Sequence, residues 1–211
     1  MGILDFLFPP VCKICNTEIR KGALCPFCAD KINVLKKSGY VRIYSQGKSF
    51  DGKYIFDYDN EIVKDLLFAV KRKGNGALFE YASQLYGSLL PESDIEFAVV
   101  NVPRSRENVR KYGYDHVSKP CKILCGRHKK AVFAPVLKRC GKSDEQKNLT
   151  REQRKNNVHG NFYAIKKDIP KNILLVDDVV TTSSTASECI KELLDVYPDA
   201  DIKCIFLAHT N

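Results

Sequence analysis

The stretch that most constrains this chain is residues 173–185, where the character of the sequence changes twice. Residues 173–176 read Ile-Leu-Leu-Val, a run typical of a strand that is buried on both faces. Two adjacent carboxylates, Asp177 and Asp178, close this run, and residues 181–185 form a turn of Thr and Ser only. A buried strand that merely ends in two acids is the simpler interpretation. The ordered series of strand, acids and hydroxyl turn is more specific, and it indicates a ligand site.

A helix is expected to begin at about Ala186, directly after this turn. Thr185 and Glu188 have the spacing of a capping box, which supports a helix start here. In an open α/β sheet, ligands bind beyond the carboxyl ends of the parallel strands, where the two acids emerge. Unpaired N–H groups and the positive end of the helix dipole favour a phosphate, while paired acids can hold sugar hydroxyls or hydrated Mg²⁺.

Residues 173–185 resemble the signature of type I phosphoribosyltransferases, which bind phosphoribosyl pyrophosphate (PRPP). The resemblance implies that Asp177 and Asp178 contact the ribose hydroxyls and act as the catalytic acids. It assigns the 5′-phosphate to five turn residues: Thr181, Thr182, Ser183, Ser184 and Thr185. The family usually has Gly in place of Ser183, because a loop that folds tightly around phosphate benefits from having no Cβ.

Four of the nine cysteines lie within the first thirty residues, as two Cys-x-x-Cys pairs. They are Cys12, Cys15, Cys25 and Cys28. Two such pairs suit a tetrahedral zinc site, in which the metal supplies the folding free energy that a short segment cannot obtain from a core. A redox dithiol and two disulfides are the alternatives. The other five cysteines follow no ligand pattern and are interpreted as small buried hydrophobic residues: Cys121, Cys125, Cys140, Cys189 and Cys204.

The remaining apolar pattern predicts an α/β fold with a mostly parallel sheet flanked by helices. The expected strands are residues 40–44, 54–58, 97–102, 132–138, 162–165, 173–176 and 202–208, the second of them after a turn at Asp51-Gly52. Helices are expected over residues 62–70 and 78–90, the first ending in a basic corner at residues 71–76. We expect residues 1–38 to form a separate zinc ribbon module and residues 39–211 the α/β domain.

The expected strand at residues 97–102 delivers a basic segment to the same sheet edge as the acids. Its first four residues are a candidate pyrophosphate loop: Pro103, Arg104, Ser105 and Arg106. A solvated basic loop is the alternative. A second basic segment, residues 138–157, has no apolar face and is expected to form a mobile loop, then a short helix, as a lid.

Positive charge is concentrated in residues 101–160, which hold 16 Lys/Arg and 5 Asp/Glu and therefore carry a net +11 in a chain of net +9. Such a region favours a polyanionic partner, either a nucleic-acid backbone or a pyrophosphate group. The candidate nucleic-acid contacts are Arg106, Arg110, Lys111, Arg151, Arg154 and Lys155. Tyr112, Tyr114 and His116 lie among these charges and can either stack on bases or pack inside the protein.

Taken in order along the chain, these motifs resemble the ComF family, the competence-associated phosphoribosyltransferase-like proteins. The resemblance rests on the four-cysteine ribbon, Val102-Pro103, Gly113-Tyr114-Asp115, residues 135–139, Gln146, Leu149, Arg154, Asn157-Val158, residues 160–162, the PRPP-type stretch and Leu207-Ala208. In this chain, Asn108 and Tyr112 stand at positions that are often basic in the family, and His209 replaces a usual Arg.

The resemblance implies a type I phosphoribosyltransferase-like fold and a cytoplasmic protein that assists uptake of single-stranded DNA in natural transformation. It also implies an ATP-driven DNA translocase as a partner and PRPP with Mg²⁺ as a ligand. An active phosphoribosyltransferase with an unidentified acceptor is the alternative function. That reaction would need no protein nucleophile, because Mg²⁺ and basic groups can stabilise the departing pyrophosphate while the acids face the oxocarbenium-like ribose.

Overall fold

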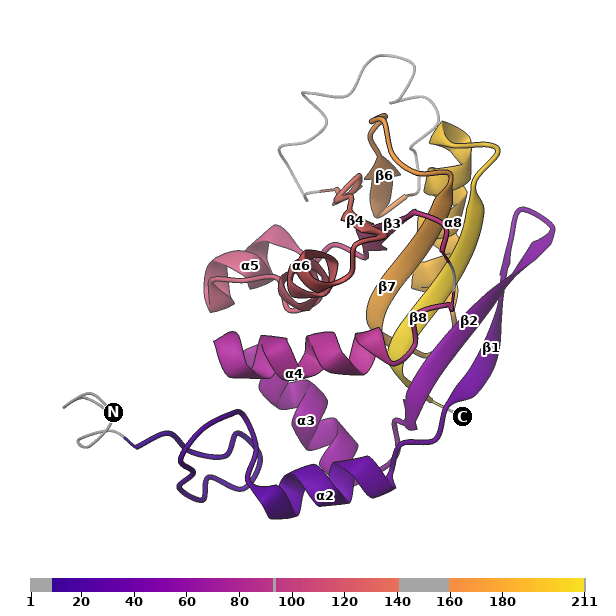
Figure 1. Ribbon diagram of the computed structural model, residues 1–211. Coiled ribbons are helices and arrows are strands. Elements are labelled where there is room, and N and C mark those ends of the chain that lie inside the picture. The colour runs from indigo at the N-terminus through magenta and orange to yellow at the C-terminus, as the bar shows by residue number, and fades with distance from the viewer. Residues whose placement is uncertain (1–8, 93, 141–159, 211) are drawn as a thin grey trace.

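A computed structural model of the chain describes residues 9–92, 94–140 and 160–210 (Figure 1). Its elements, in chain order, are α2 (Pro26–Val34), β1 (Gly39–Ser45), β2 (Lys48–Asp57), α3 (Glu61–Arg72), α4 (Gly76–Gly87), β3 (Phe97–Asn101), α5 (Arg106–Tyr112), α6 (Ser118–Arg127), β4 (Ala131–Phe133), β5 (Leu137–Arg139), β6 (Phe162–Ala164), β7 (Asn172–Val180), α8 (Ser184–Val196) and β8 (Asp201–His209). None of the described helices is long and apolar enough to cross a membrane.

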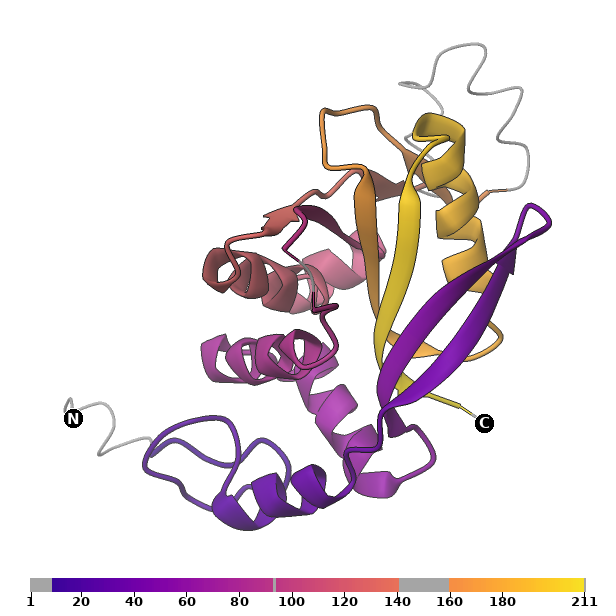
Figure 2. The ribbon, with the colours of Figure 1, turned by 45° about the vertical axis from the view of Figure 1, so that its right-hand side comes forward.

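A six-stranded sheet of order β1-β2-β8-β7-β3-β4 forms the centre of the molecule. All neighbouring strands run parallel except β1, which is antiparallel to β2. Helices α3, α4 and α6 pack on one face of the sheet and α8 on the other, as Figures 1 and 2 show. The predicted α/β class and mostly parallel sheet are confirmed.

The strand β7 is buried on both faces, as its run of branched residues predicts. Ile173 and Leu175 point to the core under α8, whereas Leu174 and Val176 point to the core under α3 and α4. The register pairs Val176 with Asn101 of β3, so β3 and β7 end at the same edge of the sheet. The basic loop and the acid pair are therefore delivered to one edge, as expected.

The hairpin at the sheet edge differs from the prediction (Figure 2). The turn lies at Gln46-Gly47, where φ is +48° and +72°, and not at Asp51-Gly52. Two consecutive residues of positive φ give a turn whose twist matches that of the flanking strands. Asp51 and Gly52 lie inside β2, opposite Arg42 and Val41 of β1.

The strand predicted over residues 132–138 is wrong as one element, because it divides into β4 and β5. Pro135, which lacks an N–H group, stands between the two short strands. The amide of Ala134 still bonds the carbonyl of Val99 in β3, at 2.9 Å, and the chain then leaves the main sheet. β5 pairs antiparallel with β6 in a separate two-stranded sheet, so residues 162–165 do not join the main sheet either.

The two predicted helices of the middle segment are confirmed, and asparagine side chains cap both. The Oδ1 atom of Asn60 accepts the amide of Ile62 at the start of α3, at 3.1 Å. Asn75 accepts the amide of Leu78 in α4 in the same way, at 3.0 Å. These caps satisfy amides that the helix itself leaves unpaired.

The N-terminal segment packs against the rest of the molecule through α2 (Figure 1). Ile32 of α2 is fully buried and belongs to the same hydrophobic cluster as Val63 and Leu66 of α3. The segment therefore shares a core with the α/β part. The boundary at residue 38 stays a prediction.

Candidate functional site

Asp177 and Asp178 lie within β7, which continues to Val180, and not at its end as expected. Asp178 makes a hydrogen bond of 2.8 Å between its Oδ2 atom and Nε2 of His116. The hydroxyl of Tyr86, on α4, donates to the main-chain carbonyl of Asp177 at 3.1 Å. Successive strand residues face opposite sides of the sheet, so the two carboxylates have different surroundings.

Those surroundings shift the pKa values of the two carboxyl groups in opposite directions. Burial raises the pKa of Asp177 well above its usual range, and the neighbouring charge of Asp178 adds to this effect. Burial alone would also raise the pKa of Asp178, but the hydrogen bond and charge of His116, with Lys71 as a further cation, lower it to about 2. Asp178 is therefore the ionised member of the pair.

The segment that follows α5 connects the acid pair to the basic loop. Oδ2 of Asp115 accepts the amide of Arg104 at 3.0 Å, and its Oδ1 accepts the amides of Val117 and Ser118 at 3.0 and 2.9 Å. The next residue, His116, holds Asp178. Asp115 and His116 thus fix the loop after β3 relative to the acids of β7.

A cluster of cations surrounds Tyr112 beside this segment. The guanidinium carbons of Arg104 and Arg72 lie 4.6 and 5.2 Å from the centre of the Tyr112 ring, and the ammonium of Lys111 lies 5.6 Å from it. Nη1 of Arg104 donates to the carbonyl of Lys71 at 3.1 Å, and Arg72 donates to the Tyr112 hydroxyl. Within the described part of the chain, none of these cations, Lys71 included, pairs with a carboxylate, and Nε of Arg104 is buried without a hydrogen-bond partner.

This arrangement contains residues that sequence reasoning did not include in the site. Lys71 and Arg72 belong to the basic corner that was interpreted as scaffold, and His116 was considered only for base stacking. Their place is set by contacts between segments far apart in the chain, such as those of Arg72 with Tyr112 and of His116 with Asp178, which charge counting along the chain does not reveal. Arg104 lies within the cluster, and Ser105 caps α5 by accepting the amide of Asn108 at 3.3 Å.

The hydroxyl turn has the predicted position but a different local structure. Helix α8 starts at Ser184, with Ser183 as its N-cap residue and no side-chain capping bond. The capping box predicted from Thr185 and Glu188 is wrong, because Thr185 is already inside α8 and Glu188 accepts the amide of Asn161. The N–H groups of the first turn of α8 are left without a side-chain cap.

Ser183 adopts the backbone conformation that the family glycine would favour. Its φ of +59° and ψ of +1° lie in the left-handed region. A side chain in this region costs about 1 kcal/mol relative to glycine, so the turn is slightly strained but retains a glycine-like geometry. Thr181, Thr182, Ser184 and Thr185 are exposed around it, and the Thr182 and Ser184 hydroxyls lie 3.0 Å apart.

The aromatic residues of the basic region contact other side chains of the protein, and only His116 is fully buried among them. The Tyr114 hydroxyl accepts the amide of Gly74 at 2.7 Å, and its ring contacts Phe79 edge-on with centroids 5.0 Å apart. Tyr112 is covered by Arg72 and Arg104, and His116 is buried against Asp178. Packing is therefore the interpretation that the structure supports for His116 and Tyr114, whereas Tyr112 is partly exposed among the cations.

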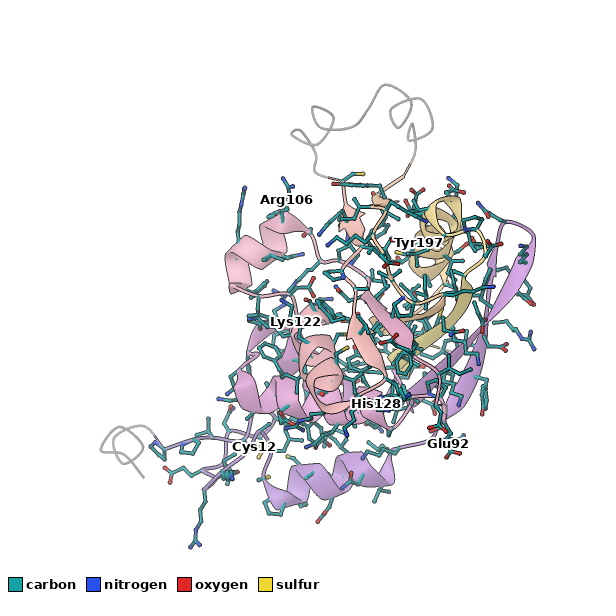
Figure 3. The ribbon with its side chains drawn as sticks, turned by 45° about the horizontal axis from the view of Figure 1, so that its top comes forward. Cys12, Glu92, Arg106, Lys122, His128 and Tyr197 are labelled. Atoms are coloured by element: carbon teal, nitrogen blue, oxygen red, sulfur yellow. The ribbon has the colours of Figure 1, made fainter. Side chains whose placement is uncertain are left out.

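The candidate nucleic-acid residues divide into two groups. Arg106, Arg110 and Lys111 are exposed on α5, and Figure 3 shows Arg106 on that helix, of which it is the first residue. The others lie outside the described residues: Arg151, Arg154 and Lys155. The predicted lid falls mostly in the same gap, residues 141–159.

The four N-terminal cysteines come together in one cluster. Their sulfur atoms all lie within 4.8 Å of one another, and the Cys15 and Cys25 sulfurs are 3.6 Å apart. Tetrahedral thiolates around zinc stand about 3.8 Å apart, given Zn–S bonds of about 2.3 Å, so the cluster fits such an ion. A hydrogen bond from Thr17 lowers the pKa of Cys15 to about 6, whereas burial raises the pKa of Cys28.

The remaining cysteines behave largely as expected. Cys121, Cys189 and Cys204 are buried, whereas Cys125 and Cys140 are partly buried. Burial raises the pKa of the Cys121 thiol well above its usual range. These three buried thiols pack in the two cores of the sheet.

Comparison of the chain with models of known protein families and with the sequences of curated proteins finds no match. Functional conclusions therefore rest on the geometry above.

Proposed function

We propose that the carboxyl edge of the sheet binds PRPP with Mg²⁺, and that the protein has a type I phosphoribosyltransferase-like fold of the ComF kind. The observation that carries the proposal is the position of Asp178, which is bonded to His116 at 2.8 Å and lies in the strand that leads directly into a hydroxyl-rich helix start, while Arg104 lies in the loop delivered to the same sheet edge. Phosphate groups bind at such helix starts, and cations with free donors bind pyrophosphate.

Each part of PRPP has a matching group in this arrangement. The turn at residues 181–185 would hold the 5′-phosphate, and Lys71 and Arg104 the pyrophosphate. Asp178 would contact the ribose hydroxyls or a hydrated Mg²⁺, because an ionised carboxylate is the ligand that this hard cation prefers. When bound, Mg²⁺ would neutralise charge on the pyrophosphate.

Calorimetric titration of PRPP with Mg²⁺ tests the pocket. We expect saturable binding to the wild type and a loss of affinity of about 100-fold in Asp177→Asn/Asp178→Asn, because the ribose and metal contacts are removed together. Asp168→Asn, an exposed acid in the loop after β6, serves as the matched control and should bind as the wild type does. Absence of binding to the wild type would contradict the proposal. Pyrophosphate release with candidate acceptors then separates the alternative, an active transferase, from a binding module.

We further propose that the basic face of α5 binds single-stranded DNA, in keeping with a cytoplasmic role in DNA uptake beside an ATP-driven translocase. The supporting observation is that the packing adds Lys71 and Arg72 to the exposed cations of α5, so that positive charge from two segments forms one surface. Phosphate backbones bind such surfaces through release of counterions.

Binding of a fluorescent oligothymidylate at several salt concentrations tests this surface. We expect Arg106→Ala/Arg110→Ala/Lys111→Ala to weaken binding and to reduce the salt slope by up to about 2, because each phosphate contact contributes about 0.7 for single strands. The control removes the same charge elsewhere, with Lys36→Ala/Lys37→Ala/Lys48→Ala at exposed positions of the N-terminal half. Equal losses in both triple variants would show that only net charge matters, against a specific surface on α5.

We also propose that the four-cysteine cluster holds a structural zinc ion. Four thiols within mutual reach are the ligand set that zinc prefers in closed structural sites.

A further inference from the structure

A cavity lies on the α3/α4 face of the sheet, at the opposite end of the strands from the acids. Its volume is about 370 Å³, within the range of about 300–1,000 Å³ that is typical of small-molecule sites. The residues that line it are Tyr40, Val41, Arg42, Asp51, Lys53, Leu89, Pro91, Leu174, Lys203, Cys204 and Ile205. Leu174 and Leu89 are buried members of the core on this face, so the cavity has an apolar floor.

Strand register explains why apolar and basic groups meet there. Tyr40 pairs with Lys53, and Lys53 pairs in turn with Ile205, which places one row of side chains on a single face. In the next row, Lys203 pairs with Leu174. An aromatic ring and two lysines therefore border a cavity whose floor is formed by the buried side chains of the core.

The charges around this cavity are not balanced. Arg42 and Asp51 form an ion pair of 3.3 Å and neutralise each other. Neither Lys53 nor Lys203 pairs with an acid among the described residues, and the Lys53 ammonium lies 5.7 Å from the centre of the Tyr40 ring. The Tyr40 side chain is 76% exposed, so one face of its ring can contact a ligand.

We infer that this cavity is a binding site for a small amphiphilic anion, that is, an aromatic or aliphatic body that carries a carboxylate, sulfonate or phosphate. The body would cover Leu89, Leu174 and Ile205 beside the Tyr40 ring, and the anionic group would contact Lys53 and Lys203. Apolar floors with a few convergent polar groups are the usual form of such sites. The cavity is independent of the proposed PRPP pocket, because the two sites share no lining residue.

The test uses two dyes that differ only in charge. 8-Anilinonaphthalene-1-sulfonate carries a sulfonate on an aromatic body, and N-phenyl-1-naphthylamine is the same body without it. We expect the sulfonate to bind at one saturable site. Lys53→Gln/Lys203→Gln should lower the affinity for the sulfonate about tenfold or more, whereas its affinity for the neutral dye should change by less than about twofold. Both lysines are on the surface of the sheet, so the variant should keep the melting temperature of the wild type.

A second variant separates this cavity from another apolar surface, between α2 and α3, that Phe27, Lys31 and Val34 line. Lys31→Gln should leave the affinity for the sulfonate unchanged. The inference is overturned if Lys53→Gln/Lys203→Gln binds the sulfonate as the wild type does, if it weakens both dyes equally, or if Lys31→Gln has the same effect. A sulfonate that does not bind at all would overturn it as well.

Discussion

Removal of metal from the four-cysteine cluster is expected to unfold the segment before α2 while the main sheet stays folded. Besides the thiols, this segment is held by a bridge between Val11 and Glu18, by a few backbone hydrogen bonds such as that from the amide of Lys13 to the carbonyl of Ala23, and by a small apolar cluster around the cysteines. Ala23 also packs in the main core. Structural zinc contributes apparent binding free energies of about 10–16 kcal/mol in zinc-finger peptides at neutral pH, far more than such contacts supply. Loss of the ion should therefore dominate the local stability.

Zinc content by elemental analysis and hydrogen exchange of residues 9–25 measure this effect. We expect one zinc per chain, and rapid exchange of these amides after treatment with a chelator or in Cys12→Ser. Cys125→Ser, which changes a partly buried thiol of α6 outside the cluster, should keep both the zinc and the protection. A chain that is purified without metal, yet protects these amides equally, would rule out the structural role.

Replacement of Asp177 by Asn is expected to stabilise the protein at neutral pH. The pKa of Asp177 is raised by burial and by the charge of Asp178, so ionisation costs more in the folded state than in the unfolded state. A raised folded pKa means that stability is complete below the unfolded pKa of about 3.9 and is lost as pH rises through the folded pKa. Asn removes that loss. We therefore expect Asp177→Asn to have a higher free energy of unfolding than the wild type at pH 7.

Asp178→Asn should have the opposite sign. The folded pKa of Asp178 is about 2, below the usual value of 3.8 for this carboxyl, so its contribution is present above the unfolded pKa and is lost as pH falls through the folded one. At pH 7 this variant should lose at most about 2 kcal/mol, because release of Asp177 from its neighbouring charge offsets part of the cost.

Urea denaturation at pH 7 and at pH 3 measures both effects, with Asp168→Asn as the exposed control. The gain of Asp177→Asn should shrink to near zero at pH 3, where the wild-type carboxyl is protonated in both states. A gain of the same size at both pH values would mean that packing, and not ionisation, causes it. Destabilisation by Asp177→Asn at pH 7 would mean that the carboxylate is stabilised by a bond that Asn cannot replace.

Several features of this molecule followed from the sequence alone, because they depend on contacts between residues close in the chain. The period and composition of residues 173–176 predicted a strand buried on both faces, and the spacing of the cysteines predicted their meeting. Helices α3 and α4 were also predictable from apolar spacing.

Other features were decided only by tertiary structure. Residues 132–138 divide between the two sheets. Before Pro135, β4 pairs with β3 of the main sheet, and after it β5 pairs with β6 of the second sheet. Likewise, Glu188 has the spacing of a capping residue, but its carboxylate instead accepts a hydrogen bond from the main-chain amide of Asn161. A local preference, such as that for a helix cap, is worth about 1 kcal/mol and is easily outweighed by tertiary contacts of this kind.

The candidate site shows the same division. The sequence alone predicts which groups are candidates for binding phosphate and sugar, because strand, acids and hydroxyl turn are consecutive in the chain. It did not determine that Asp178 is bound to His116 or that Lys71 lies beside Arg104, since these partners are separated by 62 residues in the first case and belong to different elements in the second. Only the tertiary structure brings them together, with His116 in the segment between α5 and α6 and Lys71 near the end of α3. Both carboxylates are buried, and the hydrogen bond and charge of His116 lower the pKa of Asp178 alone.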